Sequence, residues 1–340
     1  MSVESLARVG TGDPTSRAAA IVGGDLTESS LRRYLLGLEG VDAVGLEARA
    51  ADLRTRSIKT TSKAWALDTA MSLIDLTTLE GADTPGKVRS LVNKALTPDA
   101  ADPTAPRPAA VCVYGDMVAL TVENLGASWH RVNPDGIRVA AVATAFPSGR
   151  ASLGVKLLDT TEAVAAGADE IDMVIDRGAF LSGNYGRVFD QIVAVKDACA
   201  RPDGSSAHLK VILETGELGA YDTINRASWL AILAGADFIK TSTGKVSPAA
   251  TLPTTLLMLS VVREWFRLTD EKIGVKPAGG IRSSKDALSY LVAVAETVGE
   301  DWLRPDLFRF GASSLLNDVI LQRQKLASGH YSGPDYVTLD

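Results

Sequence analysis

The sequence has few of the residues on which disulfide scaffolds and metal centres depend. It holds two cysteines, Cys112 and Cys199, and three histidines, His130, His208 and His330, in 340 residues. Two cysteines cannot build a disulfide scaffold, and they suit a reducing compartment. The histidines are scattered, and no group of cysteines, histidines and carboxylates has the spacing of metal ligands. The sequence therefore predicts no metal site and indicates no cofactor.

Long apolar segments and an excess of positive charge are also missing. No apolar run approaches the roughly 20 residues that span a bilayer, and the first residues lack the basic and then apolar pattern of a secretory signal. The net charge of -6 argues against a general nucleic-acid binder. We therefore expect a cytoplasmic protein that acts on small molecules, without nucleic-acid or membrane partners. Its composition leaves homo-oligomer formation open.

The first 65 residues differ in pattern from the rest and are predicted to form a helical extension. Residues 1–26 are rich in small residues and are expected to be loose. A helix is predicted from Thr27 to a stop at Gly40, and a second helical stretch follows to about Arg56. Apolar side chains share one face of the first of these helices: Leu31, Tyr34, Leu35 and Leu38.

From about residue 66 the chain alternates between short β-like runs and helical patterns. The Asp83-Thr84-Pro85 segment is a typical helix start, with Val88, Leu91, Val92 and Ala95 then on one face. Eight strands are predicted, at Ser72–Asp75, Ala110–Tyr114, Arg138–Thr144, Glu170–Ile175, His208–Glu214, Phe238–Thr243, Gly274–Gly279 and Phe308–Ala312.

Strands that alternate with helices indicate parallel βαβ units. Eight such units favour an α/β fold of the (β/α)₈ (TIM) barrel type over an open sheet. We predict an N-terminal helical extension over residues 1–65, a barrel over 66–328 and a tail over 329–340. The Pro-rich stretch 98–108 is interpreted as a surface loop on the face away from the chemistry.

The alternation of side chains along these strands predicts a charged barrel interior. On each strand the apolar set would face the helices, and the opposite set would face inward. That inward set contains Asp172, Lys210, Lys240, Lys276 and Arg309, with Cys112 on the second strand. Barrel interiors are normally apolar, and buried lysines are rare unless they are paired. A purely structural network of ion pairs is the alternative, but adjacent cations repel one another.

Lysines in such a place favour covalent chemistry. A lysine is a nucleophile only as the neutral amine, and burial and a neighbouring cation both lower its pKa. Lys240 and Lys276 lie on consecutive predicted strands, near their C-terminal ends, where barrel enzymes place their chemistry. An amine there could attack a carbonyl to form an iminium ion, which is an electron sink for breaking a carbon–carbon bond. Asp172 could relay protons, and we expect it to lie nearer the site of proton transfer than the amine.

Two glycine-rich turns predict a phosphate site beside these lysines. Gly279-Gly280 ends the seventh predicted strand, and Ser313-Ser314 follows the eighth. Loops after the seventh and eighth strands of barrels often bind phosphate through helix N-termini. Lys245, just after the sixth strand, would add a positive charge.

These residues occur within segments that resemble the deoxyribose-phosphate aldolase family over about residues 70 to 328. The segments stand in the family's order: Ile74–Leu79, Val111–Tyr114, Phe146–Gly149, Gly167–Asp172, Glu214–Leu218, Asp237–Lys245, Val275–Arg282 and Arg309–Ser313. The resemblance implies reversible cleavage of 2-deoxy-D-ribose 5-phosphate to D-glyceraldehyde 3-phosphate and acetaldehyde, in deoxyribonucleotide catabolism. The partners would be a sugar phosphate and an aldehyde.

The resemblance also implies roles for single residues. Lys240 would form the Schiff base, Lys276 would tune its pKa, and Asp172 would transfer protons. Lys245, Thr243, Gly279, Gly280, Ser313 and Ser314 would bind the substrate and its phosphate, with Asp75, Thr77, Cys112 and Lys210 in support.

The chain departs from the family pattern in two places. Gly115 stands where the family often has proline, which leaves the shape of that loop open. Some members end in a tyrosine that reaches the active site, whereas this chain ends in Asp340 with Tyr331 and Tyr336 nearby. Whether either tyrosine takes that part stays open.

Two other functions fit the residues less well. Another Schiff-base enzyme, such as a transaldolase or a keto-acid aldolase, would differ in the pocket for its carbonyl partner. A non-catalytic barrel that binds sugar phosphates would not require the trio of Lys240, Lys276 and Asp172. Covalent trapping of a carbonyl compound would separate the enzymes from the binding protein.

Overall fold

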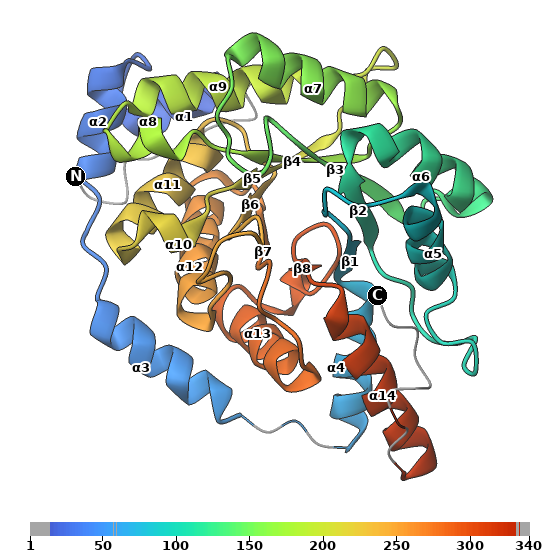
Figure 1. Cartoon of the computed structure of the whole chain (residues 1–340). Helices are drawn as coiled ribbons and strands as arrows, with labels where there is room; N and C mark the ends of the chain where they lie inside the picture. The colour runs from blue at the N-terminus through green and yellow to red at the C-terminus, as the bar shows by residue number, and fades with distance from the viewer. Residues whose placement is uncertain (1–13, 57, 59, 331–332, 334–340) are drawn as a thin grey trace.

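A parallel barrel forms the body of the molecule (Figure 1). The computed structural model describes residues 14–56, 58, 60–330 and 333, so Tyr331 and Tyr336 lie outside the described residues. Its strands are β1 Ile74–Thr77, β2 Ala110–Tyr114, β3 Arg138–Ala143, β4 Glu170–Val174, β5 His208–Ile212, β6 Phe238–Lys240, β7 Gly274–Lys276 and β8 Phe310–Gly311.

The strands follow one another in sequence order around the barrel. The eight-stranded sheet has the order β7-β6-β5-β4-β3-β2-β1-β8, and all its ladders are parallel. Single bridges between Val275 and Phe308 and between Ala278 and Gly311 join β7 to β8. These bridges close the sheet on itself, so the predicted (β/α)₈ barrel is confirmed.

Several strands end earlier than the sequence predicted. β6 ends at Lys240 rather than Thr243, β7 ends at Lys276 rather than Gly279, and β3 stops before Thr144. Thr144 and Gly279 have φ angles of 64° and 76°, which an extended strand cannot hold. The carboxyl ends of these strands therefore turn into loops, and those loops carry the candidate site.

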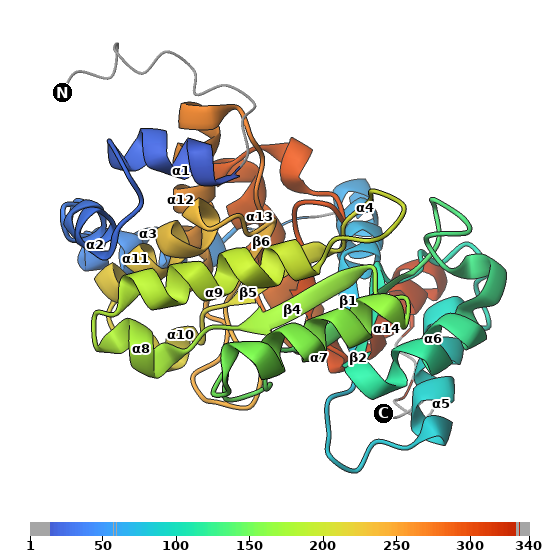
Figure 2. The same ribbon diagram turned by 90° about the horizontal axis from the view of Figure 1, so that it is seen from above.

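Helices surround the strands, and Figure 2 shows α7 and α9 alongside β4. The helices that follow the strands are α5 Pro85–Leu96, α6 Val118–Leu125, α7 Leu153–Ala165, α8 Arg177–Leu181, α9 Tyr185–Ala198, α10 Thr215–Leu218, α11 Tyr221–Leu233, α12 Leu252–Thr269, α13 Ser284–Thr297 and α14 Ser314–Ser328. Short 3₁₀ turns also lie at Gly115–Met117, Gly126–Ser128 and Glu300–Trp302. The first of these begins at Gly115, which shows the loop shape that the sequence left open.

The start of α5 follows the predicted pattern. The Thr84 side chain accepts a hydrogen bond from the Lys87 N–H at 3.2 Å, and Pro85 occupies the first turn, where its missing N–H costs nothing. Val88, Leu91 and Val92 are buried as predicted. The Pro-rich stretch 98–108 then connects the end of α5 to the start of β2, at the amino ends of the strands. That end is opposite the loops that form the candidate site.

The N-terminal helices are α1 Pro14–Val22, α2 Glu28–Leu36, α3 Ala43–Arg54 and α4 Thr60–Ser72. α1 and α2 pack on α11, α3 packs on α12 and α13, and α4 packs on α13 and α14. The expectation of a loose stretch over residues 1–26 was wrong for residues 14–22, which form α1 and pack on α11 and α2. The stop at Gly40 was also wrong, since α2 ends at Leu36 with Gly37 as its cap. The domain boundary at residue 65 falls within α4 and stays a prediction.

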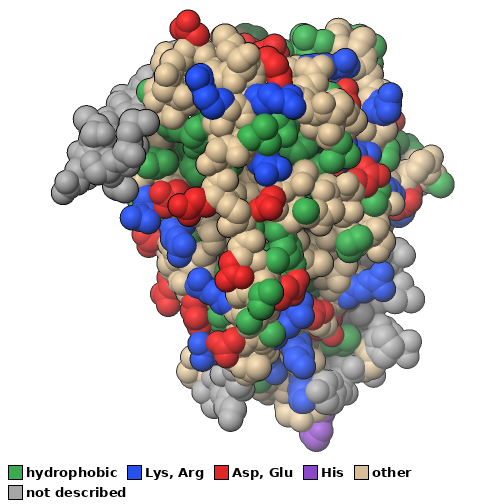
Figure 3. Space-filling view, turned by 90° about the vertical axis from the view of Figure 1, so that its left-hand side faces the viewer, with side chains coloured by type: hydrophobic (Ala, Val, Ile, Leu, Met, Phe, Trp, Pro, Cys, Tyr) green, Lys and Arg blue, Asp and Glu red, His purple; other side chains and the backbone are tan. Residues whose placement is uncertain are grey.

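The surface mixes charges of both signs. On the face seen in Figure 3, Lys and Arg side chains are interspersed with Asp and Glu side chains. Across residues 14–56, 58, 60–330 and 333, no helix is both long and apolar enough to cross a membrane.

Candidate active site

The strands β4 to β8 place ionisable side chains inside the barrel, as the alternation predicted. Asp172, Lys210, Lys276 and Arg309 are fully buried, and Lys240 is 3% exposed. Their neighbours on the same strands, such as Ile171, Leu209 and Val275, belong to the apolar core beneath the helices. Contacts between strands that are not adjacent, such as Asp172 on β4 with Lys276 on β7, run through the interior.

Three of these side chains form a cluster near the carboxyl ends of the strands. The Oδ2 atom of Asp172 lies 2.7 Å from the Lys240 Nζ and 2.7 Å from the Lys276 Nζ. Lys240 and Lys276 are direct partners in the register of β6 and β7. We call Asp172, Lys240 and Lys276 the upper cluster. In it, one carboxylate is shared by two amines.

The shared carboxylate corrects one expectation. Asp172 was expected to lie nearer the site of proton transfer than the Lys240 amine, but it is hydrogen-bonded to that amine and to Lys276 alike. The sequence could not show this, because the pairing depends on how far β4 is staggered relative to β6 and β7 in the closed barrel.

The pKa values of the two lysines in the upper cluster are shifted in opposite directions. Burial lowers the pKa of Lys240, and the neighbouring Lys276 charge lowers it further, although Asp172 opposes both. Burial also acts on Lys276, but Asp172 and Asp75 outweigh it and raise the pKa of Lys276 above its usual range. Burial disfavours the ionised form of Asp172, yet Lys240 and Lys276 hold its pKa well below its usual range. The cluster thus favours a neutral Lys240 beside a charged Lys276.

A second network lies deeper in the barrel, and we call it the lower cluster: Asp75, Glu170, Lys210 and Arg309. Arg309 reaches Asp75 Oδ1 at 2.5 Å and Glu170 Oε1 at 2.6 Å. Lys210 pairs with Glu170 and lies 3.3 Å from Asp172 Oδ1. Asp75 also lies 2.5 Å from the Lys276 Nζ, which links the two clusters.

Charge in the lower cluster is balanced, and its cations lower the pKa values of its two carboxyls. Burial opposes ionisation of Glu170, but Arg309 and Lys210 lower the pKa of that carboxyl. Arg309 and Lys276 likewise lower the pKa of Asp75 against the effect of burial. The structural ion-pair interpretation therefore describes the lower cluster well. Glu170 was not singled out from the sequence, although it stands two residues before Asp172 and so shares its face of β4.

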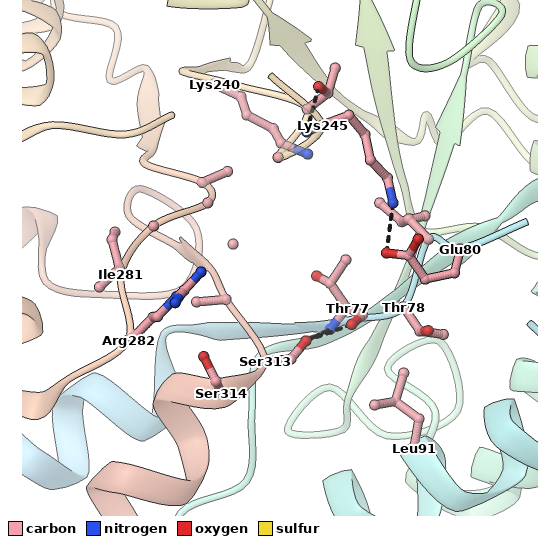
Figure 4. A pocket seen from close by; sticks show the side chains of 18 of the residues that line it. Thr77, Thr78, Glu80, Leu91, Lys240, Lys245, Ile281, Arg282, Ser313 and Ser314 are labelled. Carbon is pink, nitrogen blue, oxygen red and sulfur yellow. Dashed lines mark hydrogen bonds and ion pairs between the residues drawn. The ribbon is translucent and has the colours of Figure 1, made fainter. Parts of the chain in front are cut away.

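A pocket of about 490 Å³ opens above the upper cluster (Figure 4). Lys240 lies in its wall, whereas the other two members of the upper cluster are buried beneath it. The pocket brings together eight residues that the sequence singled out: Thr77, Lys240, Thr243, Lys245, Gly279, Gly280, Ser313 and Ser314. Asp75, Cys112 and Lys210 do not line it.

The glycine turn after β7 adopts a backbone shape that only glycine holds easily. Gly279 and Gly280 have φ angles of 76° and 81°. A Cβ atom at Gly279 would lie 2.9 Å from the Ala249 Cβ, so a larger residue would also clash. The Gly279 N–H donates to the Gly311 carbonyl at 3.0 Å, and it is therefore used within the barrel.

The serines after β8 divide into two roles. The Ser313 hydroxyl accepts from the Thr77 N–H at 3.1 Å and donates to the Thr77 carbonyl, so it ties the β8 loop to the end of β1. Ser313 makes no side-chain cap to α14, whose first residue is Ser314. The N–H groups of that first helical turn have no partner within the helix. They form a partly positive wall of the pocket.

Thr243 is held in place by a residue that the sequence reasoning did not single out. Buried Glu214 accepts hydrogen bonds from the Thr243 hydroxyl at 2.5 Å and from its N–H at 3.2 Å. The Thr243 Oγ1 in turn accepts from the Lys245 N–H at 3.1 Å. Glu214 has a left-handed φ of 57°, which is uncommon for a residue with a side chain. These contacts fix the loop that carries Lys245.

Another wall comes from the loop after β1 and from α5, and sequence reasoning assigned α5 only to packing. It contributes Thr78, Leu79, Glu80, Lys87, Ser90, Leu91 and Lys94. Arg282, just after the glycine turn, also lines the pocket and could have been found from its place in the motif. The α5 residues gave no such signal, since lysines on a helix are usual on any surface.

The interior between β2 and β3 is apolar. Leu79, Ala110, Cys112, Ala140 and Val142 form a small cluster, with Tyr114 and Phe146 packed against it. Burial raises the pKa of the Cys112 thiol to about 11, so it stays protonated and a weak nucleophile. Over the described ranges, from residue 14 to 330 apart from residues 57 and 59, no group of three His, Cys, Asp or Glu side chains could hold a metal ion.

Known proteins are similar in sequence to most of this chain. Residues 69–320 match the sequence profile of the family described as DeoC/LacD family aldolase. Deoxyribose-phosphate aldolase of Mus musculus is 43% identical over 285 residues, which are 82% of this chain and 86% of that protein. The enzyme of that name from Homo sapiens is 42% identical over 84% of this chain and 89% of its own length.

Solved structures agree with the sequence comparison. Deoxyribose phosphate aldolase from Aeropyrum pernix, described as a tetramer, superposes with a TM-score of 0.56 at 26% identity, over 85% of this chain and all of that one. QR15, described as an aldolase, has a TM-score of 0.55 at 28% identity over 75% of this chain and 96% of its own. The profile match spans most of the barrel, including both clusters and the glycine turns, and so this chain belongs to the DeoC/LacD family of aldolases.

Proposed function

We propose that this enzyme reversibly cleaves 2-deoxy-D-ribose 5-phosphate to D-glyceraldehyde 3-phosphate and acetaldehyde through a Schiff base on Lys240. The observation that carries the proposal is that Lys240 is the member of the upper cluster that lines the pocket, and its pKa is lowered by burial and by Lys276. A neutral amine at the surface of a pocket can attack a carbonyl. The names of the mouse and human relatives support the choice of substrate.

The chemistry follows from the upper cluster. The Lys240 amine would add to the C1 aldehyde of the open-chain sugar, and loss of water would give an iminium ion. Removal of the C3 hydroxyl proton would then break the C2–C3 bond, with the electron pair taken up by the iminium to give an enamine. Glyceraldehyde 3-phosphate leaves, C2 of the enamine is protonated, and hydrolysis releases acetaldehyde and the free amine.

Asp172 and Lys276 would support these steps. Asp172 contacts the Lys240 amine at 2.7 Å, so it can move protons to and from the nitrogen and, through water, the substrate. Lys276 is held charged by Asp172 and Asp75 and would keep Lys240 from being protonated. Asp75 and Lys210 would hold this arrangement from below. Thr77 and Cys112 would shape the wall and the interior beside it.

The phosphate would bind at the far wall of the pocket. The side chains of Lys245 and Arg282 supply positive charge from two sides of the pocket, and Figure 4 shows Arg282 and Ser314 on one side of the space with Lys245 on another. The first turn of α14, which begins at Ser314, adds the partly positive end of a helix, a usual phosphate-binding feature. Thr243, Gly279, Gly280, Ser313 and Ser314 would complete the site.

Three broader proposals accompany this one. The reaction would serve deoxyribonucleotide catabolism, and the enzyme would act in the cytoplasm. The tetramer described for the Aeropyrum pernix relative supports a homo-oligomer.

A comparison of two sugars tests the substrate. The enzyme should release acetaldehyde from deoxyribose 5-phosphate, and kcat/KM for unphosphorylated deoxyribose should be lower by about a hundredfold or more, because charge-assisted contacts to phosphate contribute roughly 1.5–3 kcal/mol each. Acetaldehyde is detected with a coupled dehydrogenase. Equal kcat/KM values for the two sugars would refute the phosphate site. Activity on keto acids or on ketose donors alone would instead favour the other Schiff-base aldolases.

A further inference from the structure

Two charged side chains meet across the mouth of the pocket. The Lys245 Nζ lies 2.6 Å from Glu80 Oε1, and the dashed line in Figure 4 marks this pair. Glu80 follows β1 and Lys245 follows β6, so the pair joins loops from distant parts of the barrel. Both residues line the pocket. Lys245, which we propose binds the phosphate, is therefore already paired with the carboxylate of Glu80.

The backbone around Glu80 is held firmly. The Thr78 hydroxyl donates to Asp83 Oδ1 at 2.8 Å, and the Glu80 N–H donates to Asp83 Oδ2 at 2.9 Å. Lys87 adds an ion pair to Asp83 at 2.8 Å. Asp83 thus fixes the backbone of this loop through its own carboxylate, and the Glu80 carboxylate takes no part in these contacts. This leaves that carboxylate free to turn toward Lys245 or away from it.

The pair itself is of a kind that breaks easily. The side chain of Glu80 is 63% exposed and that of Lys245 is 29% exposed. Exposed ion pairs contribute little to stability, because water and salt compete for both charges. Glu80 accepts no other side-chain hydrogen bond among the described residues. The backbone of this loop is fixed, whereas in the part of the chain that the structure describes the Glu80 carboxylate is held only by its pair with Lys245. Such a pair can break and form again during turnover.

We propose that Glu80 is a specificity-determining residue that competes with the substrate's phosphate for the Lys245 ammonium group. In the empty pocket Glu80 holds Lys245. The phosphate dianion displaces the carboxylate on binding, and Glu80 takes Lys245 back as the phosphorylated product leaves. Glu80 thereby weakens binding of phosphate compounds and eases their release. This inference rests on the proposed phosphate site, but it does not depend on Lys240 chemistry.

The test removes the negative charge of Glu80 and measures phosphate binding directly. Binding of inorganic phosphate is measured by isothermal titration calorimetry to the wild type, Glu80→Gln, Lys245→Gln and the double variant. Glu80→Gln should tighten binding about threefold to tenfold, because it removes both the competing pair and a repulsive charge. In the Lys245→Gln background the same change should have at most a small effect. The matched control is Glu264→Gln on α12, which removes an exposed carboxylate paired with Arg267 and should leave phosphate binding unchanged.

Kinetics with the two sugars give a second readout. Glu80→Gln should lower KM for deoxyribose 5-phosphate by a similar factor and leave kcat/KM for unphosphorylated deoxyribose unaltered. Unchanged or weaker phosphate binding in Glu80→Gln would overturn the inference, as would equal tightening in the Lys245→Gln background. If no sugar is cleaved but phosphate binding follows the predicted pattern, the proposed function fails and the competition stands. If the sugar is cleaved but phosphate binding does not follow the predicted pattern, the proposed function stands and the competition by Glu80 fails.

Discussion

The upper and lower clusters both combine buried carboxylates with buried cations, yet they differ in charge balance and in access to the pocket. In the lower cluster two cations, Lys210 and Arg309, face two carboxylates, Asp75 and Glu170. In the upper cluster two lysines share one oxygen of Asp172, and one of the lysines borders the pocket. Buried charges that are fully paired are held ionised and inert. A buried amine with too little negative charge around it is pushed toward its neutral, reactive form.

The largest difference should appear when Lys240 is replaced. Lys240→Met removes the amine but keeps a similar volume, and Asp172 retains Lys276 as a partner. We expect kcat/KM to fall by about 10⁴-fold or more, as when other covalent nucleophiles are removed, with no loss of folding stability. Steady-state cleavage of deoxyribose 5-phosphate and urea unfolding check the two halves of this prediction. A variant that retains a tenth of the activity would contradict the role of Lys240.

Replacement of Arg309 should do the opposite. Arg309→Leu leaves Asp75 and Glu170 buried with one cation fewer, and breaking a buried pair in this way costs about 3–5 kcal/mol. The free energy of unfolding measures this loss. The folded fraction of the variant should keep the pH–rate profile of the wild-type enzyme, since Arg309 does not contact Lys240. A specific loss of kcat without loss of stability would mean that the lower cluster takes part in the chemistry.

The destabilisation in Arg309→Leu should also depend on pH. In the wild type the pKa values of Glu170 and Asp75 are lowered by Arg309, so their contribution to stability is present above the ordinary carboxyl pKa and is lost as pH falls toward the folded values. In the variant, burial would raise these pKa values, and the carboxyls would take up protons at higher pH. The gap in unfolding free energy between the two proteins should therefore narrow from pH 7.5 to pH 4. A gap that widens as pH falls would contradict the pairing.

A smaller effect is expected from Lys276→Leu. The change removes the charge that lowers the pKa of Lys240, and it leaves Asp172 to stabilise the Lys240 ammonium, so both consequences raise that pKa. The limb of the pH–rate profile in which activity appears with deprotonation should move upward by about one to two pH units. Lys210→Met is the matched comparison in the lower cluster: Lys210 contacts Asp172 but not Lys240, so the limb should move less than in Lys276→Leu. A folded Lys276→Leu variant with the wild-type profile would show that Lys276 does not tune the nucleophile.

No effect is expected from chelators. The proposed iminium ion replaces the Lewis acid that a metal would supply. Activity after dialysis against EDTA should equal that of the untreated enzyme. Activity that disappears with the chelator and returns with a divalent cation would overturn the mechanism.

The sequence predicted the interior residues well, because the alternation of side chains along a strand is a local property. Asp172, Lys240 and Lys276 each stand opposite apolar neighbours that belong beneath the helices. The turns at Gly279-Gly280 and Ser313-Ser314 were also predictable, since loops after the last strands of a barrel meet at one end.

The partners of these residues could not be predicted in the same way. Asp172 bridges both lysines, and Glu170 rather than Asp172 pairs with Arg309. Both pairings depend on the stagger of strands in the closed barrel. The wall from α5 and the pairing of Glu80 with Lys245 depend on how loops from β1 and β6 approach one another. The helix α1 packs on α11, and a contact between segments so far apart in the chain is not visible in the sequence.

Borohydride trapping tests the central claim most directly. The enzyme is incubated with acetaldehyde or deoxyribose 5-phosphate, reduced with borohydride, digested and mapped by mass spectrometry. If the unbalanced charge of the upper cluster makes Lys240 the nucleophile, the enzyme should lose activity and the two-carbon or sugar adduct should lie on Lys240. An adduct found only on Lys276 or Lys210, or no adduct in an enzyme that still cleaves the sugar, would contradict the account.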